Sequence, residues 1–181
     1  GATGVSVSGE GVSAKILGIG EMPEDRQKAA ARRDEAKGMK FMEVEISIDP
    51  KAPEGLRTLR ATSADGASNG YFFYVGSLPE TREGPARRSM GDAQEIAPLP
   101  CTVNGQIYEG ERDFYKFKLQ KGKTYVFDLK ARRIRPYLAD AVPGWFQATM
   151  RMYDEKGETL AYADDYQNSP DPTLIYTPAK N

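Results

Sequence analysis

The sequence predicts an all-β chain that forms two tandem β-sandwich domains, with one short inserted helix near residues 23–37. Short strand-like runs recur between Gly, Asn, Asp and Pro residues along most of the chain, which is the pattern of a β-sandwich. Its 181 residues also suit two domains of roughly 90 residues each. The longest apolar run, Tyr71–Val75, is far below the roughly 18 residues that a membrane span needs. We therefore expect no membrane span.

The first half contains five predicted strands, at 5–8, 13–17, 41–48, 58–62 and 71–75. In the third of these, apolar and polar residues alternate, so one face should be buried and the other exposed to water. The connection before the last strand, 64–70, concentrates Gly, Asn and Asp, which accept a positive φ, and it is expected to form a hairpin.

The predicted helix begins with Pro and acidic residues and ends with Lys and Gly, which are the preferences of helix starts and stops. Its apolar residues are almost all alanine, so it has little surface with which to pack on a core. We expect a solvated helical insertion.

The region after the first sandwich is rich in Pro, Gly and Arg over 77–91, which favours a connection over a packed element. We therefore predict a first domain over 1–78, a linker over 79–94 and a second domain over 95–181. Strands of the second domain are predicted at 101–107, 113–119, 124–131, 149–153, 159–163 and 174–176, with hairpin loops at 120–123 and 154–158.

Composition excludes several chemistries. The chain has no histidine, which removes Ser-His-Asp and Cys-His machinery, imidazole bases and zinc sites that use imidazole. Its 25 basic and 26 acidic residues leave a net charge of -1, so no global basic field attracts nucleic acid. The lone Cys101 cannot form an internal disulfide, and it is either a buried structural thiol or a reactive one. We expect no enzyme, no catalytic residues and no cofactor other than a possible calcium ion.

The second half carries a series of short motifs in a fixed order, at 102–107, 113–117, 121–127, 131–133, 153–157, 163–165 and 171–172. Together they resemble the bacterial pre-peptidase C-terminal domain, a β-sandwich of secreted peptidases and of large surface proteins of planctomycete-type bacteria. The resemblance covers roughly residues 98–181. It implies export to the periplasm, the cell surface or the extracellular space.

The first half resembles an immunoglobulin-like module of the IPT/TIG type at 53–57, 66–69 and 73–76, and such a module often precedes that domain. The two resemblances imply immunoglobulin-like or jelly-roll-like sandwiches. They also imply that strands are missing before Val5 and after residue 178, so that the chain is a fragment of a multidomain protein whose sheet edges are covered by neighbouring elements.

Aromatic residues are the first candidates for ligand binding. Trp145 and Phe146 follow a Pro-Gly turn, where the loop tips of sandwiches often carry function, and Tyr137 precedes them. With Tyr162 and Tyr166 they could stack on a sugar or a peptide, or they could fill the core as aromatic residues commonly do.

Charged residues give two further candidates. Arg132, Arg133 and Arg135 form a basic patch that either pairs with carboxylates of the domain or captures an acidic glycan, with Arg133 as the candidate ligand-binding residue. A calcium site would use Asp113 and Asp92, although two arginines stand in 84–92 where the resemblance implies carboxylates. The alternative is that these carboxylates are solvated turn residues. Asp164 and Asp165 are adjacent on a strand and point to opposite faces, which excludes a glycosidase pair.

These observations predict a non-catalytic structural or adhesive accessory region of a larger exported bacterial protein. One alternative is a glycan- or protein-binding module that targets an attached hydrolase, and another is a removable secretion appendage of a peptidase. The expected partners are other domains of the parent protein, neighbouring subunits, or extracellular polysaccharide or protein, but not nucleic acid.

Overall fold

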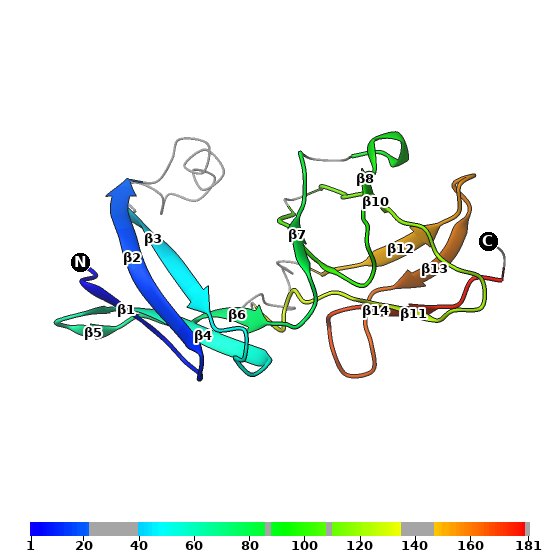
Figure 1. Cartoon of the computed structure of the whole chain (residues 1–181). Coiled ribbons are helices and arrows are strands. Elements are labelled where there is room, and N and C mark those ends of the chain that lie inside the picture. Colours follow the sequence, from blue (N-terminus) through cyan, green and yellow to red (C-terminus); the bar gives the residue numbers. More distant parts are fainter. Residues whose placement is uncertain (22–39, 86–87, 108–109, 135–146, 180–181) are drawn as a thin grey trace. The chain divides into compact units, whose positions relative to one another are not determined.

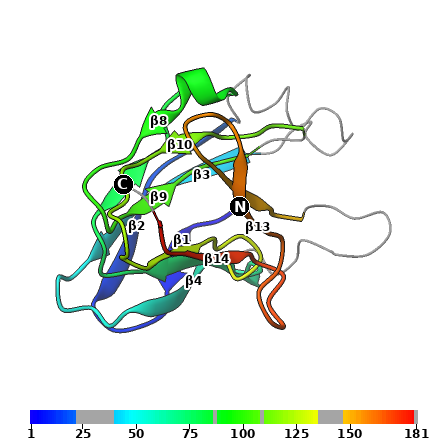
Figure 2. The same cartoon turned by 90° about the vertical axis from the view of Figure 1, so that its right-hand side faces the viewer.

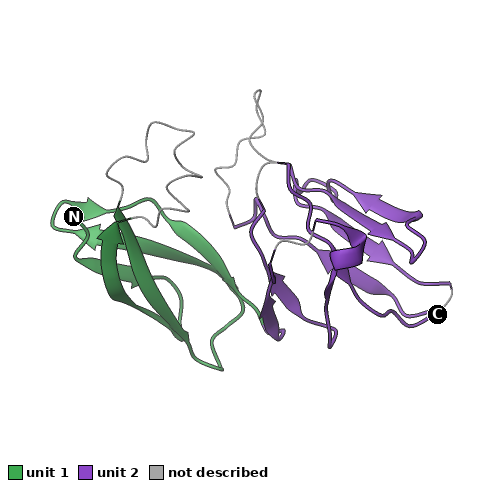
Figure 3. Ribbon diagram, turned by 90° about the horizontal axis from the view of Figure 1, so that it is seen from above, with its two compact units in different colours: residues 1–76 green, residues 77–181 purple. Residues whose placement is uncertain are grey.

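The computed structural model describes residues 1–21, 40–85, 88–107, 110–134 and 147–179. These described residues form fourteen strands and one short 3-10 helix, so the predicted all-β fold class is confirmed (Figure 1). The predicted helix near 23–37 lies outside them. The chain divides into two compact units, Gly1–Gly76 and Ser77–Asn181 (Figure 3). No helix within the described part is long and apolar enough to cross a membrane.

Unit 1 is built around a long central strand, β4, which pairs antiparallel with three others, and a separate two-stranded ribbon of β2 and β3 lies beside that sheet (Figure 1). The strands are β1 (Gly4–Val7), β2 (Val12–Glu21), β3 (Lys40–Ile48), β4 (Gly55–Ser63), β5 (Gly66–Ala67) and β6 (Tyr71–Val75). The partners of β4 are β1, β5 and β6.

Two predictions for unit 1 are confirmed. Along β3, Met42, Val44 and Ile46 are half-buried while the residues between them are exposed, as the alternating pattern requires. The Gly-rich connection 64–70 joins β4 to β6 as a hairpin, with β5 inside it and a positive φ of 133° at Gly66.

Arg57 of β4 is one of the few buried residues of unit 1, at 8% exposure. Its guanidinium donates to the backbone carbonyl of Leu56 at 3.1 Å and to that of Pro53, which fastens the turn before β4. A Cβ at Gly9 would stand 2.5 Å from the Nε of Arg57, and Gly9 has a φ of 93°. Glycine is therefore required there to admit the guanidinium.

Unit 2 combines two parallel and two antiparallel strand pairs. The parallel pairs are β7 (Glu80–Arg82) with β9 (Thr102–Asn104) and β8 (Gln94–Glu95) with β10 (Tyr115–Lys116), the latter shown side by side in Figure 2. The antiparallel pairs are β11 (Tyr125–Asp128) with β14 (Thr173–Tyr176) and β12 (Met150–Tyr153) with β13 (Thr159–Ala163). A 3-10 helix, η2, covers Met90–Asp92.

The stretch 79–94, predicted as a linker, contains paired structure of unit 2. Both β7 and the start of β8 lie in it, and each pairs with a strand further along the chain. Gln94 ties the stretch together, because its Oε1 accepts the N–H of Gly84 at 2.7 Å and its Nε2 donates to the carbonyl of Arg82 at 3.1 Å. The prediction was wrong because a polar, Gly-rich composition does not exclude short strands whose partners are distant in sequence.

Of the two predicted hairpin loops in unit 2, 154–158 is confirmed, since it joins the antiparallel strands β12 and β13. The loop at 120–123 does turn, with Lys123 N–H donating to the carbonyl of Gln120 at 3.2 Å, but the strand that follows pairs with β14 at the end of the chain. The local hairpin expected there was therefore wrong. The core of unit 2 includes Ile96, Ala148, Met152 and Leu174.

Candidate functional site

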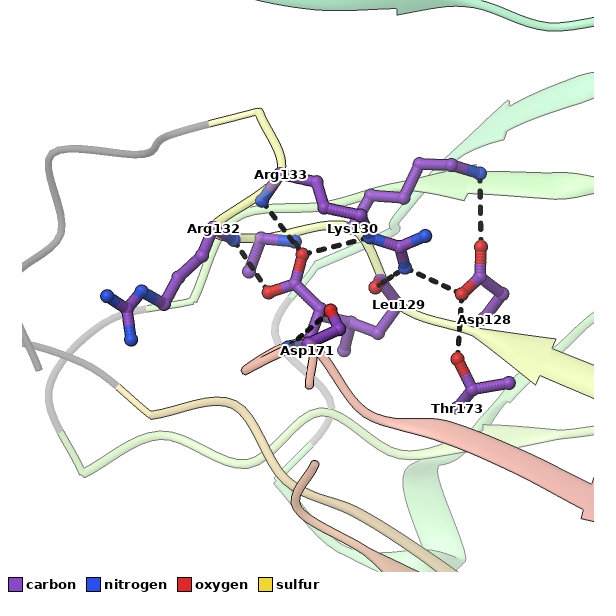
Figure 4. A network of polar contacts seen from close by, with 9 residues as sticks. Asp128, Leu129, Lys130, Arg132, Arg133, Asp171 and Thr173 are labelled. Carbon is purple, nitrogen blue, oxygen red and sulfur yellow. Dashed lines mark hydrogen bonds and ion pairs between the residues drawn. The ribbon is translucent and has the colours of Figure 1, made fainter. Parts of the chain in front are cut away.

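Asp171, just before β14, has a fully buried side chain at 0% exposure. Its carboxylate accepts the backbone N–H groups of Ala131, Arg132 and Arg133 at 3.1, 2.7 and 2.8 Å, and the Nε of Arg133 at 3.2 Å (Figure 4). A carboxylate is stable in a protein interior when charged or N–H donors replace its water. Asp171 therefore fixes the chain as it leaves β11.

Arg133 links Asp171 to a second carboxylate, Asp128 (Figure 4). Its Nη2 lies 2.6 Å from Oδ1 of Asp128, which also accepts the hydroxyl of Thr173 at 2.9 Å. Lys130 lies 3.3 Å from the other oxygen of Asp128. Burial raises the pKa of Asp128, but hydrogen bonds from Arg133 and Thr173 and the charge of Arg133 outweigh burial and hold that pKa below its ordinary value. We call Asp128, Lys130, Ala131, Arg132, Arg133, Asp171 and Thr173 the Asp171 network.

The network bears on the predicted basic patch. Arg133, a candidate for ligand binding, is engaged by both Asp171 and Asp128, which favours pairing with domain carboxylates over capture of an acidic glycan. Arg132 contributes its backbone N–H, and its side chain points away from Asp171 (Figure 4). Arg135 lies outside the described residues.

A second group of charged side chains in unit 2 raises pKa values instead of lowering them. It contains three carboxylates, an arginine and a tyrosine, and we call it the Glu83 cluster: Glu83, Arg88, Glu111, Asp113 and Tyr115. Glu83 accepts the backbone N–H of Gln106 at 2.6 Å and the hydroxyl of Tyr115 at 3.3 Å. Burial and the negative charges of Glu111 and Glu83 raise the pKa of Asp113, against the charge of Arg88. Burial, with the charges of Glu83 and Asp113, raises the pKa of Tyr115 to about 12.

The predicted calcium ligands, Asp113 and Asp92, lie near the starts of β10 and β8, which pair with each other. Asp92 accepts the hydroxyl of Ser89 at 2.9 Å, and Asp113 is opposed by Arg88. Within the described ranges, no group of three or more acidic or cysteine side chains is placed to hold a metal ion. Calcium binding through these two residues stays a prediction.

The outer face of the β12–β13 hairpin presents an exposed tyrosine. Tyr162 is 49% exposed, and the guanidinium of Arg151 lies over its ring, 5.2 Å from the centroid. The two residues are cross-strand partners. The hydroxyl of Tyr162 donates to Asp164 at 3.5 Å, and Leu160 nearby on the same strand is 43% exposed. We call Arg151, Leu160, Tyr162 and Asp164 the hairpin face.

The exposure of Tyr162 favours the binding interpretation of this aromatic residue over the core interpretation. Tyr166 is 38% exposed in a tight turn closed by two backbone hydrogen bonds with Ser169. Trp145, Phe146 and Tyr137, the other predicted aromatic ligands, lie outside the described residues.

Sequence reasoning missed Arg151. Its position between Met150 and Met152 on a predicted strand was the available signal, because alternation places a charged residue between two apolar ones on the exposed face. The residue opposite it could not be inferred so simply. The register shifts between Met152 and Tyr153, and this irregularity sets Arg151 against Tyr162.

No protein-family model, curated protein or solved structure matches the chain.

Proposed function

We propose that the chain is a non-catalytic accessory region of a larger exported bacterial protein, in which unit 2 makes adhesive contact with another macromolecule. The observation that carries the proposal is the hairpin face, where an exposed ring, an arginine and an apolar side chain lie together on the antiparallel pair of β12 and β13. Tyrosine and arginine are enriched at the centres of recognition surfaces. Residues on paired strands are also held more rigidly than residues on loops.

The Asp171 network supports the accessory role. Its carboxylates are saturated by backbone N–H groups, Arg133, Lys130 and Thr173 of the same unit, so this charged group maintains the fold. Chemistry at a substrate needs polar groups that are still available to it. The resemblance of the second half to the pre-peptidase C-terminal domain supports the same role and supports export.

A second candidate is a binding module that targets an attached hydrolase to glycan or protein. The same hairpin face favours it, because targeting and adhesion both need a surface for another macromolecule. The two differ in what the parent protein carries beside this chain.

The proposal is tested by binding of the whole chain to immobilised polysaccharides, collagen-like peptides and extracellular matrix proteins. We expect retention on at least one of these surfaces, with loss of retention in the Arg151→Ala/Tyr162→Ala double variant. Val126→Ala, which alters a 62% exposed side chain on β11, is the control and should bind as the parent does. Retention that is equal in parent and double variant, or no retention on any surface, would contradict the proposal.

A further inference from the structure

The guanidinium of Arg151 is oriented but not neutralised. Its contact with the ring of Tyr162 holds it in place, and within the described part of the chain no carboxylate forms an ion pair with it. A planar guanidinium that is already positioned loses little conformational freedom when it binds two oxygens at once. The side chain is thus prepared for a ligand with two adjacent oxygen atoms.

Arg151 lies over the ring of Tyr162, and a hydrogen-bond acceptor, Asp164, lies next to its hydroxyl. Asp164 is half-buried, and its described contact is the long hydrogen bond of 3.5 Å from the Tyr162 hydroxyl. Arginine offers only donors and an ionised aspartate only acceptors, whereas a hydroxyl group both donates and accepts. A pair of neighbouring hydroxyls can therefore satisfy either residue, and a chain of them can satisfy both.

The charge of the hairpin argues against a strongly charged ligand. Residues 150–164 contain two basic side chains, Arg151 and Lys156, and four acidic ones, Asp154, Glu155, Glu158 and Asp164. This net negative charge repels a polyanion, and the hairpin face itself carries one positive and one negative side chain, Arg151 and Asp164, so it does not select a polycation. A neutral ligand rich in hydroxyls meets no such repulsion.

We propose that the hairpin face binds a neutral polysaccharide, with the apolar face of one pyranose ring against Tyr162 and Leu160 and its hydroxyls bonded to Arg151 and Asp164. The inference rests on the proposed function and names its ligand class. Arg151 covers one face of the tyrosine ring, so the sugar contacts the part of this half-exposed ring that remains open. The ring and Leu160 supply apolar contact, and the two charged groups set the orientation of the sugar.

The test is affinity electrophoresis of the whole chain through gels that contain neutral polymers, namely xylan, mannan, β-glucan or dextran, beside gels with alginate or polygalacturonate. We expect retardation by at least one neutral polymer. Tyr162→Ala and Arg151→Ala should each weaken that affinity by about tenfold or more, which corresponds to the loss of one good contact. Tyr162→Phe keeps the ring and should bind within a few-fold of the parent.

Two controls separate binding from folding. Ile175→Ala changes a 54% exposed residue on β14 and should leave retardation unchanged. The thermal melt of each variant shows whether it is folded, and Arg151→Ala reports on the site even if Tyr162→Ala unfolds.

Three results would overturn the inference. The first is retardation by acidic polymers only, lost at high salt, since this marks a charge interaction. The second is retardation by a neutral polymer that is equal in all variants, which places the site elsewhere. The third is the absence of retardation by any polymer while the chain still binds a collagen-like peptide or matrix protein through Tyr162. That third result leaves the proposed adhesive function standing and removes only the polysaccharide.

Discussion

The Asp171 network and the Glu83 cluster are both built on carboxylates of unit 2, but they treat the negative charge in opposite ways. In the network, each carboxylate faces donors, and the pKa of Asp128 falls below its ordinary value despite the opposing effect of burial. In the cluster, burial and the negative charges of Glu111 and Glu83 raise the pKa of Asp113 against the opposing charge of Arg88. Burial raises both values and is the largest cause of the rise at Asp113, and only at Asp128 do hydrogen bonds and opposite charges reverse it.

The difference shows where unit 2 gains and loses stability. Ionisation of Asp128 is easier in the folded chain than in the unfolded chain, so its charge stabilises the fold. Ionisation of Asp113 is harder in the folded chain, so its charge destabilises the fold. The network therefore stabilises the folded state, and the charge of Asp113 in the cluster destabilises it until protonation at lower pH removes that charge.

The largest effect is expected from Asp171→Ala. The substitution leaves three backbone N–H groups and the Nε of Arg133 without their acceptor inside the unit. Removing a buried carboxylate while its donors remain in place costs about 3–5 kcal/mol. We expect a loss of this size in the free energy of unfolding from urea titration at pH 7.

Asp165→Asn provides the control, because this neighbouring aspartate is exposed. It should change the unfolding free energy by no more than about 0.5 kcal/mol. A loss as small as this for Asp171→Ala would mean that the network does not fasten the chain after β11.

A smaller effect is expected from Asp128→Asn, which removes the charge that Arg133 and Lys130 face. The loss at pH 7 should be about 1 kcal/mol, as for a partly exposed ion pair with hydrogen bonds. Because the folded pKa of Asp128 is lowered, the stabilisation is present above the unfolded pKa and is lost as the pH falls through the folded one. Urea titrations of the parent and the variant should therefore converge at acidic pH, and a constant gap would argue against charge as the cause.

The two regions also differ in how far the sequence predicts them. The series Arg132, Arg133, Arg135 predicted a basic patch that pairs either with carboxylates of the domain or with an acidic glycan, and Arg133 pairs with carboxylates. The identity of its partner was hidden, because Asp171 is 38 residues further along the chain. Local patterns predict strands and tight turns, as at β3 and at 154–158, since both depend on neighbouring residues.

Pairing between distant strands leaves no such local signal. The partnerships of β7 with β9 and of β11 with β14 depend on the whole unit, and for this reason the predicted linker and one predicted hairpin were wrong. The pairing of residues across the hairpin face could not be predicted from the sequence either. The positions of Arg151 and Tyr162 on exposed strand faces were readable, but the register shift that brings them together was not.

The smallest effect, and the one that tests the cluster most directly, is expected from Asp113→Asn. The substitution removes a charge that burial disfavours and that Glu111 and Glu83 repel, so it should raise the melting temperature slightly at pH 7. Because the folded pKa of Asp113 is raised, the parent is penalised above that pKa, and the penalty disappears as the pH falls to the ordinary value of about 3.9. The rise in melting temperature of Asp113→Asn over the parent should therefore shrink steadily as the pH falls. Asp128→Asn should instead be less stable than the parent at pH 7 and approach it as the pH falls. A destabilised Asp113→Asn at pH 7 would show instead that Arg88 dominates, and that both carboxylate groups of unit 2 fasten the fold.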